Sequence, residues 1–202
     1  MMRFLDFLFP PRVDEIAVRK VSVDAFLALV VPRVVPETRP ETVAILSFAN
    51  ERVRAAIHEA KYHGSSRAFE LLATALADYL RDADDGYRKP LIIPVPLGAA
   101  RRKERGFNQV EEIAQRAANE LGIPVDTTLL IRTRETTSQV SLQRREREKN
   151  MRGAFGAAHS IDPSHTYIVI DDVITTGATL QSAIDTLAGA GAKRIISLAL
   201  AH

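Results

Sequence analysis

Residues 167–180 limit the fold of this chain more than any other part of the sequence. Four consecutive apolar residues, 167–170, predict a short buried strand, and two carboxylates, Asp171 and Asp172, follow it directly. A turn of small residues at 175–179 then leads into a segment whose apolar residues have helical spacing. A strand that enters a helix through a short turn is typical of a sheet covered by helices.

The rest of the chain repeats this alternation. Apolar runs predict strands at 42–48, 91–96, 125–131, 167–170 and 195–200. Helical spacing predicts helices after Asn50 and at about 66–80, 108–121 and 179–190. We therefore expect an α/β fold, a parallel sheet flanked by helices, over residues 42–202. Half of the ten prolines fall within the first 40 residues, so residues 1–41 are expected to be an irregular N-terminal extension.

The turn after the Asp pair has the properties of a phosphate site. In open parallel sheets, ligands bind at the carboxyl ends of strands, and the N–H groups of a helix N-terminus attract anions. Gly177 permits the left-handed or close-approach geometry that such a turn needs. The residues expected to bind the phosphate are Val173, Ile174, Thr175, Thr176, Gly177, Ala178 and Thr179.

The two carboxylates need a different partner, because they would repel a phosphate. Carboxylates accept hydrogen bonds from hydroxyl groups and suit hard cations, so ribose hydroxyls and a hydrated Mg²⁺ fit Asp171 and Asp172. A sugar phosphate satisfies the carboxylates and the turn at once. The sequence therefore predicts a sugar-phosphate site at the end of this strand.

The composition excludes several other classes of protein. The chain has no cysteine, which excludes disulfides, thiolate metal sites and a cysteine nucleophile. Its five histidines lack metal-ligand spacing, and no apolar run approaches the ~18 residues of a membrane span. No signal-peptide cleavage site follows the apolar start, so we expect a cytoplasmic protein. The net charge of +2 is too small to indicate a nucleic-acid partner by itself.

Residues 167–180 resemble the signature loop of the type I phosphoribosyltransferases, which bind phosphoribosyl pyrophosphate. Further segments, in the same order, resemble the ComF subfamily over about residues 42–202. They are Lys-Tyr-His-Gly at 61–64, Pro-Val-Pro-Leu at 94–97, Glu-Arg-Gly-Phe-Asn-Gln at 104–109, Arg-x-Thr-x-x-Gln-x-x-Leu at 134–142 and Gly-Ala-Phe at 153–155. ComF proteins often begin with Leu-Phe-Pro-Pro-Arg, present here at 8–12, followed by a zinc ribbon. Val13 and Ile16 stand at the cysteine positions, so no zinc is expected.

The resemblance implies a transferase that binds phosphoribosyl pyrophosphate with Mg²⁺ and passes the phosphoribosyl group to a nitrogen nucleophile. Asp171 and Asp172 would be the catalytic residues, and Mg²⁺ would arrive with the substrate rather than on direct protein ligands. The loop after Pro96 would bind the diphosphate through Leu97, Gly98, Arg101, Arg102, Lys103 and Arg105. Residues 136–152 would form a flexible hood that closes over the substrate, with Gln139, Arg147 and Asn150 as its contacts.

Other functions stay open from the sequence. ComF relatives are associated with DNA uptake during competence, so a non-catalytic module that binds single-stranded DNA or a protein partner is the alternative. Residues 131–152 carry seven basic and three acidic side chains, which suits an anionic strand, but exposed aromatics for base stacking are scarce. A regulator that senses phosphoribosyl pyrophosphate without turnover fits equally well, and the chain can be a homo-oligomer. Lys61 can reach a phosphate or pair with a carboxylate on the surface.

Overall fold

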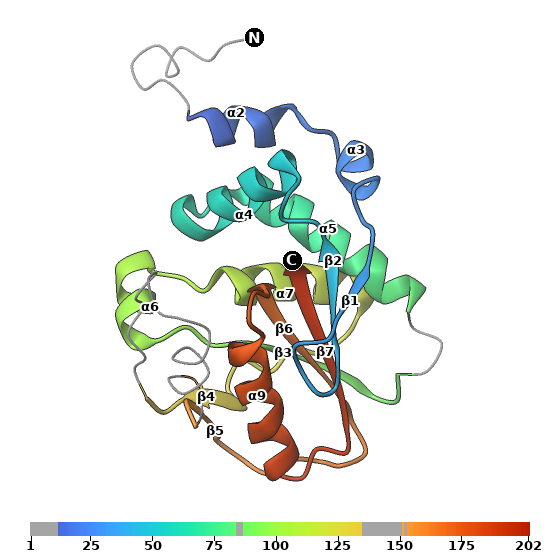
Figure 1. Ribbon diagram of the computed structural model, residues 1–202, viewed down its shortest axis with the longest axis vertical. Coiled ribbons are helices and arrows are strands. Elements are labelled where there is room, and N and C mark those ends of the chain that lie inside the picture. The colour runs from blue at the N-terminus through green and yellow to red at the C-terminus, as the bar shows by residue number, and fades with distance from the viewer. Residues whose placement is uncertain (1–11, 84–86, 135–150, 152) are drawn as a thin grey trace.

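The computed structural model describes residues 12–83, 87–134, 151 and 153–202. A five-stranded sheet in the order β1-β2-β7-β6-β3 forms its centre (Figure 1). The strands are β1 (Arg33–Val35), β2 (Thr42–Leu46), β3 (Pro90–Pro94), β6 (Thr166–Val173) and β7 (Arg194–Ala201). Neighbouring strands run parallel except β1, which pairs antiparallel with β2. The expected α/β fold with a parallel sheet is confirmed.

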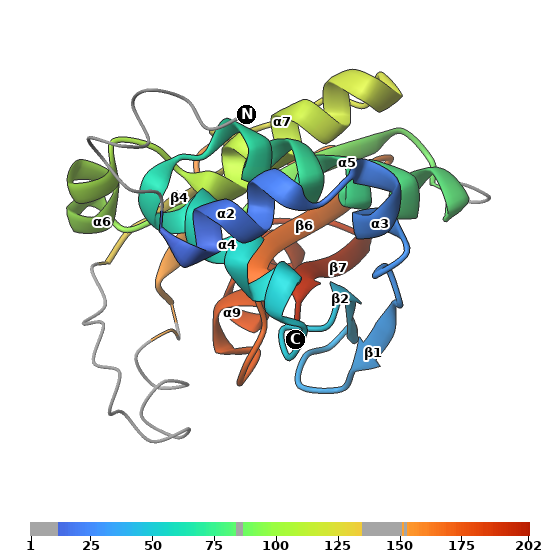
Figure 2. The ribbon, with the colours of Figure 1, turned by 90° about the horizontal axis from the view of Figure 1, so that it is seen from above.

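Helices cover both faces of this sheet, as Figure 2 shows. One face carries α2 (Val13–Lys20), α3 (Val23–Leu27), α4 (Glu51–His63), α5 (Ser66–Asp82) and α7 (Gln109–Leu121). The opposite face carries α9 (Ala178–Gly189) together with a small antiparallel pair, β4 (Leu130–Arg132) and β5 (Phe155–Ala157). A short helix, α6 (Ala99–Arg105), lies between β3 and α7 in the chain.

Strand pleating divides the apolar residues of β6 between two cores. Ile168 and Ile170 belong to the core under α4, α5 and α7, whereas Tyr167 and Val169 belong to the core under α9. Successive side chains of a strand point to opposite faces, so a strand covered on both sides reads as one continuous apolar run. That is why the sequence at 167–170 shows no polar alternation.

Residues 13–35 differ from the irregular structure expected of them. They form α2, α3 and β1, and Val18 and Phe26 are buried in the main core. Arg12 reinforces this attachment, because its guanidinium donates two hydrogen bonds of 3.0 and 2.8 Å to the buried carboxylate of Glu59 on α4. Pro32 directly precedes β1, and Pro36 and Pro40 lie in the segment between β1 and β2. These prolines separate short secondary-structure elements and do not indicate an irregular segment.

Two other local expectations were wrong. Residues 125–131 do not form a continuous strand: Val125 makes an isolated bridge to Ile92, and β4 begins only at Leu130. The Asp126 carboxylate accepts the N–H groups of Thr128 and Leu129, and this turn interrupts the extended chain. The basic segment expected to be a loop contains α6, which ends at Gly106 in the left-handed conformation.

None of the described helices is long and apolar enough to cross a membrane.

Candidate functional site

The Asp pair lies at the carboxyl end of β6, next to the end of β3. The pleat of β6 directs Asp171 to the side of Val169 and α9, and Asp172 to the side of Ile170, α4 and α7. The two adjacent carboxylates therefore have different surroundings, although the sequence alone gave them equal roles.

Asp172 is buried and well supplied with donors. Its Oδ2 accepts a 2.7 Å hydrogen bond from Gln109 Nε2 of α7 and lies 3.2 Å from Lys61 Nζ of α4. Its Oδ1 accepts the N–H of Val173 at 2.7 Å. A buried carboxylate needs such partners, because an unpaired charge away from water is costly. Lys61 thus pairs with a carboxylate, but with the buried Asp172 of the candidate site and not with a surface carboxylate as expected.

Asp171 has a different electrostatic environment. Burial, and next the neighbouring charge of Asp172, raise its pKa to about 7. The N–H of Asp172, which donates to Asp171 Oδ1 at 2.8 Å, and the positive charges of Lys61 and Arg132 oppose that increase. A carboxyl group that titrates near neutral pH inside a site is ready to accept a proton or a hydroxyl hydrogen bond.

The turn after β6 presents free backbone donors. Gly177 precedes α9 with φ of 72°, and its carbonyl accepts the N–H of Gln181. Among the residues that the structure describes, the N–H groups of Thr175, Thr176, Gly177 and Thr179 donate to no protein acceptor. Free N–H groups at a helix N-terminus form an anion site, since the helix dipole adds a partial positive charge there.

The turn between β1 and β2 packs directly against this loop. A Cβ placed on Gly177 would lie 2.9 Å from the side chains of both Glu37 and Thr38. Gln181 of α9 secures the contact: its Oε1 accepts the N–H of Arg39 at 2.7 Å and its Nε2 donates to the Arg39 carbonyl at 3.3 Å. Gly177 is thus required by its positive φ and by this close approach together.

Two arginines of the basic segment at 101–105 have side-chain partners, and two other cations of the segment do not form ion pairs with described residues. Arg102 is paired with Glu111 at 2.8 Å, and Arg105 donates to Gln109 Oε1 at 3.1 Å. Since Gln109 in turn donates to Asp172, Arg105 is connected to the Asp pair through one amide. Arg101 and Lys103 form no ion pair with any described residue. Leu97 and Gly98 lie between β3 and α6, and Gly98 precedes the first turn of that helix.

Sequence reasoning missed part of this arrangement. Gln109 belongs to the Glu-Arg-Gly-Phe-Asn-Gln segment, and its place in that motif was the only sequence signal for it. Gln181 and the turn at 36–41 carried no signal at all. The hood residues Gln139, Arg147 and Asn150 lie outside the described residues. The β4–β5 pair flanks the hood in the chain, and its Arg132 is close enough to affect Asp171.

The donor set fits a magnesium ion that is carried by a substrate. No cluster of three or more His, Asp or Glu side chains that suits a metal exists among the described residues. Mg²⁺ retains several water ligands and is bound in proteins through one or two carboxylates together with substrate phosphates. Asp171 and Asp172 would lie near such an ion, which the substrate would hold.

A parallel sheet with two carboxylates at a strand end, a glycine turn with free N–H groups and a helix behind it define a phosphoribosyltransferase-type domain. The sequence profile of the phosphoribosyl transferase domain matches residues 62–202. Competence protein F of Haemophilus influenzae is 31% identical over 160 residues, 77% of this chain and 70% of that protein. DNA utilization protein YhgH of Salmonella typhi is 32% identical over 69% of this chain, and competence protein ComFC of Streptococcus pneumoniae is 31% identical over 64%.

The chain belongs to the ComF family of phosphoribosyl transferase domain proteins. It spans 62% of the length of the Salmonella protein and 56% of the Streptococcus protein.

Proposed function

We propose that this protein binds phosphoribosyl pyrophosphate together with Mg²⁺ and transfers the phosphoribosyl group to a nitrogen nucleophile in the cytoplasm. One observation supports the proposal most: four N–H groups of the 175–179 turn have no acceptor among the described residues, and they follow closely in the chain a carboxylate with a pKa of about 7. An anion cradle beside a hydrogen-bond acceptor matches a sugar phosphate, whose phosphate and hydroxyl groups need opposite partners.

The turn and the two acids have separate roles in this proposal. The 175–179 turn binds the 5′-phosphate, and Asp171 accepts hydrogen bonds from the ribose hydroxyls. Asp172, held by Lys61 and Gln109, fixes the end of β6 in place. Mg²⁺, when bound through the diphosphate, offsets its negative charge.

The reaction breaks the bond between the sugar C1 and the diphosphate oxygen and forms a bond from C1 to the nucleophile nitrogen. The bonding electrons leave with pyrophosphate, and the nitrogen loses its proton to water or to a base. Arg101 and Lys103, which have no described ion-pair partner, stabilise the charge that develops on the departing diphosphate.

Calorimetry tests the binding. We expect the wild type to bind phosphoribosyl pyrophosphate in the presence of Mg²⁺ and the Asp171→Asn/Asp172→Asn variant to bind at least about tenfold more weakly, a loss of ~1.4 kcal/mol. Asp82→Asn, an exposed position at the end of α5, is the control for removal of an acid. Equal affinity for wild type and the double variant contradicts the proposed site.

A second assay separates an enzyme from a sensor. Release of radiolabelled pyrophosphate with a panel of nitrogenous bases identifies the acceptor, and binding without release for every base indicates a sensor. The single-stranded DNA alternative rests on residues 131–152, most of which lie outside the described residues. Retention on single-stranded DNA at about 50 mM salt that is lost at about 200 mM supports it.

A further inference from the structure

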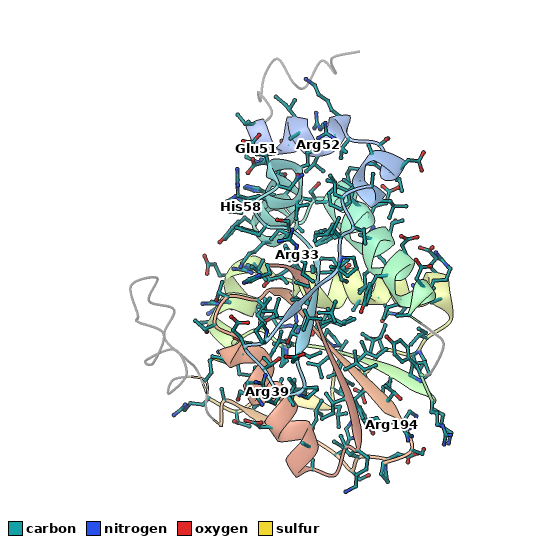
Figure 3. The ribbon with its side chains drawn as sticks, turned by 45° about the vertical axis from the view of Figure 1, so that its right-hand side comes forward. Arg33, Arg39, Glu51, Arg52, His58 and Arg194 are labelled. Atoms are coloured by element: carbon teal, nitrogen blue, oxygen red, sulfur yellow. The ribbon has the colours of Figure 1, made fainter. Side chains whose placement is uncertain are left out.

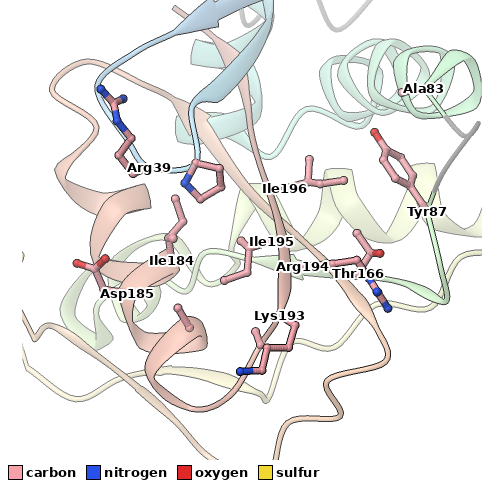
Figure 4. A pocket seen from close by; sticks show the side chains of 13 residues that line it. Arg39, Ala83, Tyr87, Thr166, Ile184, Asp185, Lys193, Arg194, Ile195 and Ile196 are labelled. Carbon is pink, nitrogen blue, oxygen red and sulfur yellow. The ribbon is translucent and has the colours of Figure 1, made fainter.

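A cavity of about 650 Å³ lies at the other end of the sheet from the Asp pair. Thr166, the first residue of β6, lines it and is six residues from Asp172, about 20 Å along a strand. The volume is within the roughly 300–1,000 Å³ of small-molecule sites. We call this hollow the edge cavity; Figure 4 shows its side chains.

The edge cavity exists because two neighbouring strands have different lengths. β7 begins at Arg194, but β2 begins at Thr42, which pairs with Ser197. Residues 194–196 therefore have β6 on one side and no strand on the other. The chain before Thr42 turns away at Arg39 and Pro40, which form one wall of the cavity.

The gap in the sheet joins its two faces. Ile195 packs with the core under α9 and Ile196 with the core under α5, and both line the cavity. Ile184 of α9 lies on one side of β7 and Tyr87 on the other (Figure 4). Ala188 of α9 also lines the cavity. Most of the surface is thus apolar and includes one aromatic ring, which favours a flat or branched apolar body.

The polar groups of the edge cavity favour an anion. Its lining contains Arg39, Lys193 and Arg194 against one acid, Asp185, whose carboxylate already accepts a hydrogen bond from Gln181. Arg39 donates to the carbonyls of Pro36 and Thr38, and Arg194 donates to the carbonyl of Ser164, so both keep their positive charge but already have backbone acceptors. Figure 3 shows Arg39 and Arg194 at the end of the molecule away from α4. Lys193 is exposed and pairs with no acid in the described part of the chain.

Thr166 gives an independent indication of a ligand. Its side chain is 97% buried, with 3% exposed, and its Oγ1 has no hydrogen-bond partner among the described residues. A buried hydroxyl without a partner is costly, by about 1–3 kcal/mol, and most such groups in proteins are satisfied. Protein atoms cover Oγ1, but Thr166 lines the cavity, so a shift of its side chain toward the cavity would bring this hydroxyl to a polar atom of an occupant.

We propose that the edge cavity binds a small organic anion with an apolar ring or branched body. The acidic group lies at the rim beside Lys193 and Arg194, the body lies between Ile196, Tyr87 and Ala188, and a polar atom meets Thr166. This site is separate from the sugar-phosphate site and does not depend on the proposed transferase activity.

The test uses 8-anilinonaphthalene-1-sulfonate, an aromatic anion whose fluorescence increases on binding. We expect saturable binding that Ala188→Phe weakens by at least about tenfold, because the ring fills the cavity. Ala190→Phe is the matched control, since Ala190 is also an exposed alanine, two residues away, and does not line the cavity. Equal dye affinity for the two variants overturns the proposed site.

The charge requirement has its own test. Lys193→Gln is expected to weaken dye binding by about two- to fivefold, the range for an exposed charge contact, and Lys20→Gln on α2 to leave it unchanged. Neither variant should affect N-phenyl-1-naphthylamine, which has the same rings and no sulfonate. Circular dichroism confirms that each variant is folded. Equal weakening of both dyes, or of neither, by Lys193→Gln overturns the assignment of an anion.

Discussion

Substitution of Gly177 by alanine tests whether the turn at 36–41 holds the phosphate loop. Alanine at a φ of 72° costs ~1–2 kcal/mol in backbone strain. Its methyl group would also lie 2.9 Å from the side chains of Glu37 and Thr38 and 3.1 Å from the Glu37 carbonyl. Since backbone borders the new atom, the neighbours cannot simply rotate away, and such overpacking adds ~1–3 kcal/mol.

Gly122 provides a matched control. It follows α7 with a φ of 70°, and a Cβ placed there meets nothing within 4 Å. Gly122→Ala therefore has the strain alone, and the change in unfolded-chain entropy is common to both variants. We expect urea unfolding to give a free energy of unfolding ~1–3 kcal/mol lower for Gly177→Ala than for Gly122→Ala. Thermal unfolding should show a midpoint about 2–12 °C lower. Equal values for the two variants would refute the close packing.

Further predictions concern stability measured by denaturant unfolding. Asp171 has a folded-state pKa of about 7 against 3.8 in the unfolded chain, so the native state binds the extra proton between pH 4 and 7. Stability should fall as pH rises through that window, by at most about 4 kcal/mol, and Asp171→Asn should remove the fall. Phe26→Ala should lower the free energy of unfolding by about 3–5 kcal/mol, because Phe26 is 1% exposed, and Val13→Ala by less than about 0.5 kcal/mol. A small effect of Phe26→Ala would mean that α3 is loosely attached. Lys61→Met should cost about 1–3 kcal/mol through the loss of the cation facing a buried carboxylate. Lys103→Met, which removes an exposed cation, is the control. An equal loss of unfolding free energy in the two variants would show that the ion pair of Lys61 with Asp172 does not stabilise the fold.

The sequence predicted most of the sheet because local patterns determine a buried parallel strand. The apolar run at 167–170, with its turn, led to β6 and to a helix within one residue of the observed start of α9. The same patterns failed at 125–131, where the side chain of Asp126 accepts backbone N–H groups and ends the strand.

The candidate site was predicted less completely, because much of it depends on distant contacts. Gln109 donates a hydrogen bond to Asp172 although 63 residues separate them in the sequence, and no periodic pattern predicts such a pairing. The different surroundings of Asp171 and Asp172 follow from which helix covers each face, and that requires the fold. The binding roles of the turn and of the basic segment stay predictions.

The alternation of side chains along β6 decides on which side of the sheet each of the two acids lies. Asp171 is two residues from Val169 and Asp172 two residues from Ile170, so each acid stays on the side of its apolar neighbour. One residue inserted between Tyr167 and Ile170 would exchange the sides of everything on one flank of the insertion relative to the other. An insertion within this strand therefore keeps both acids on their sides of the sheet only in steps of two residues.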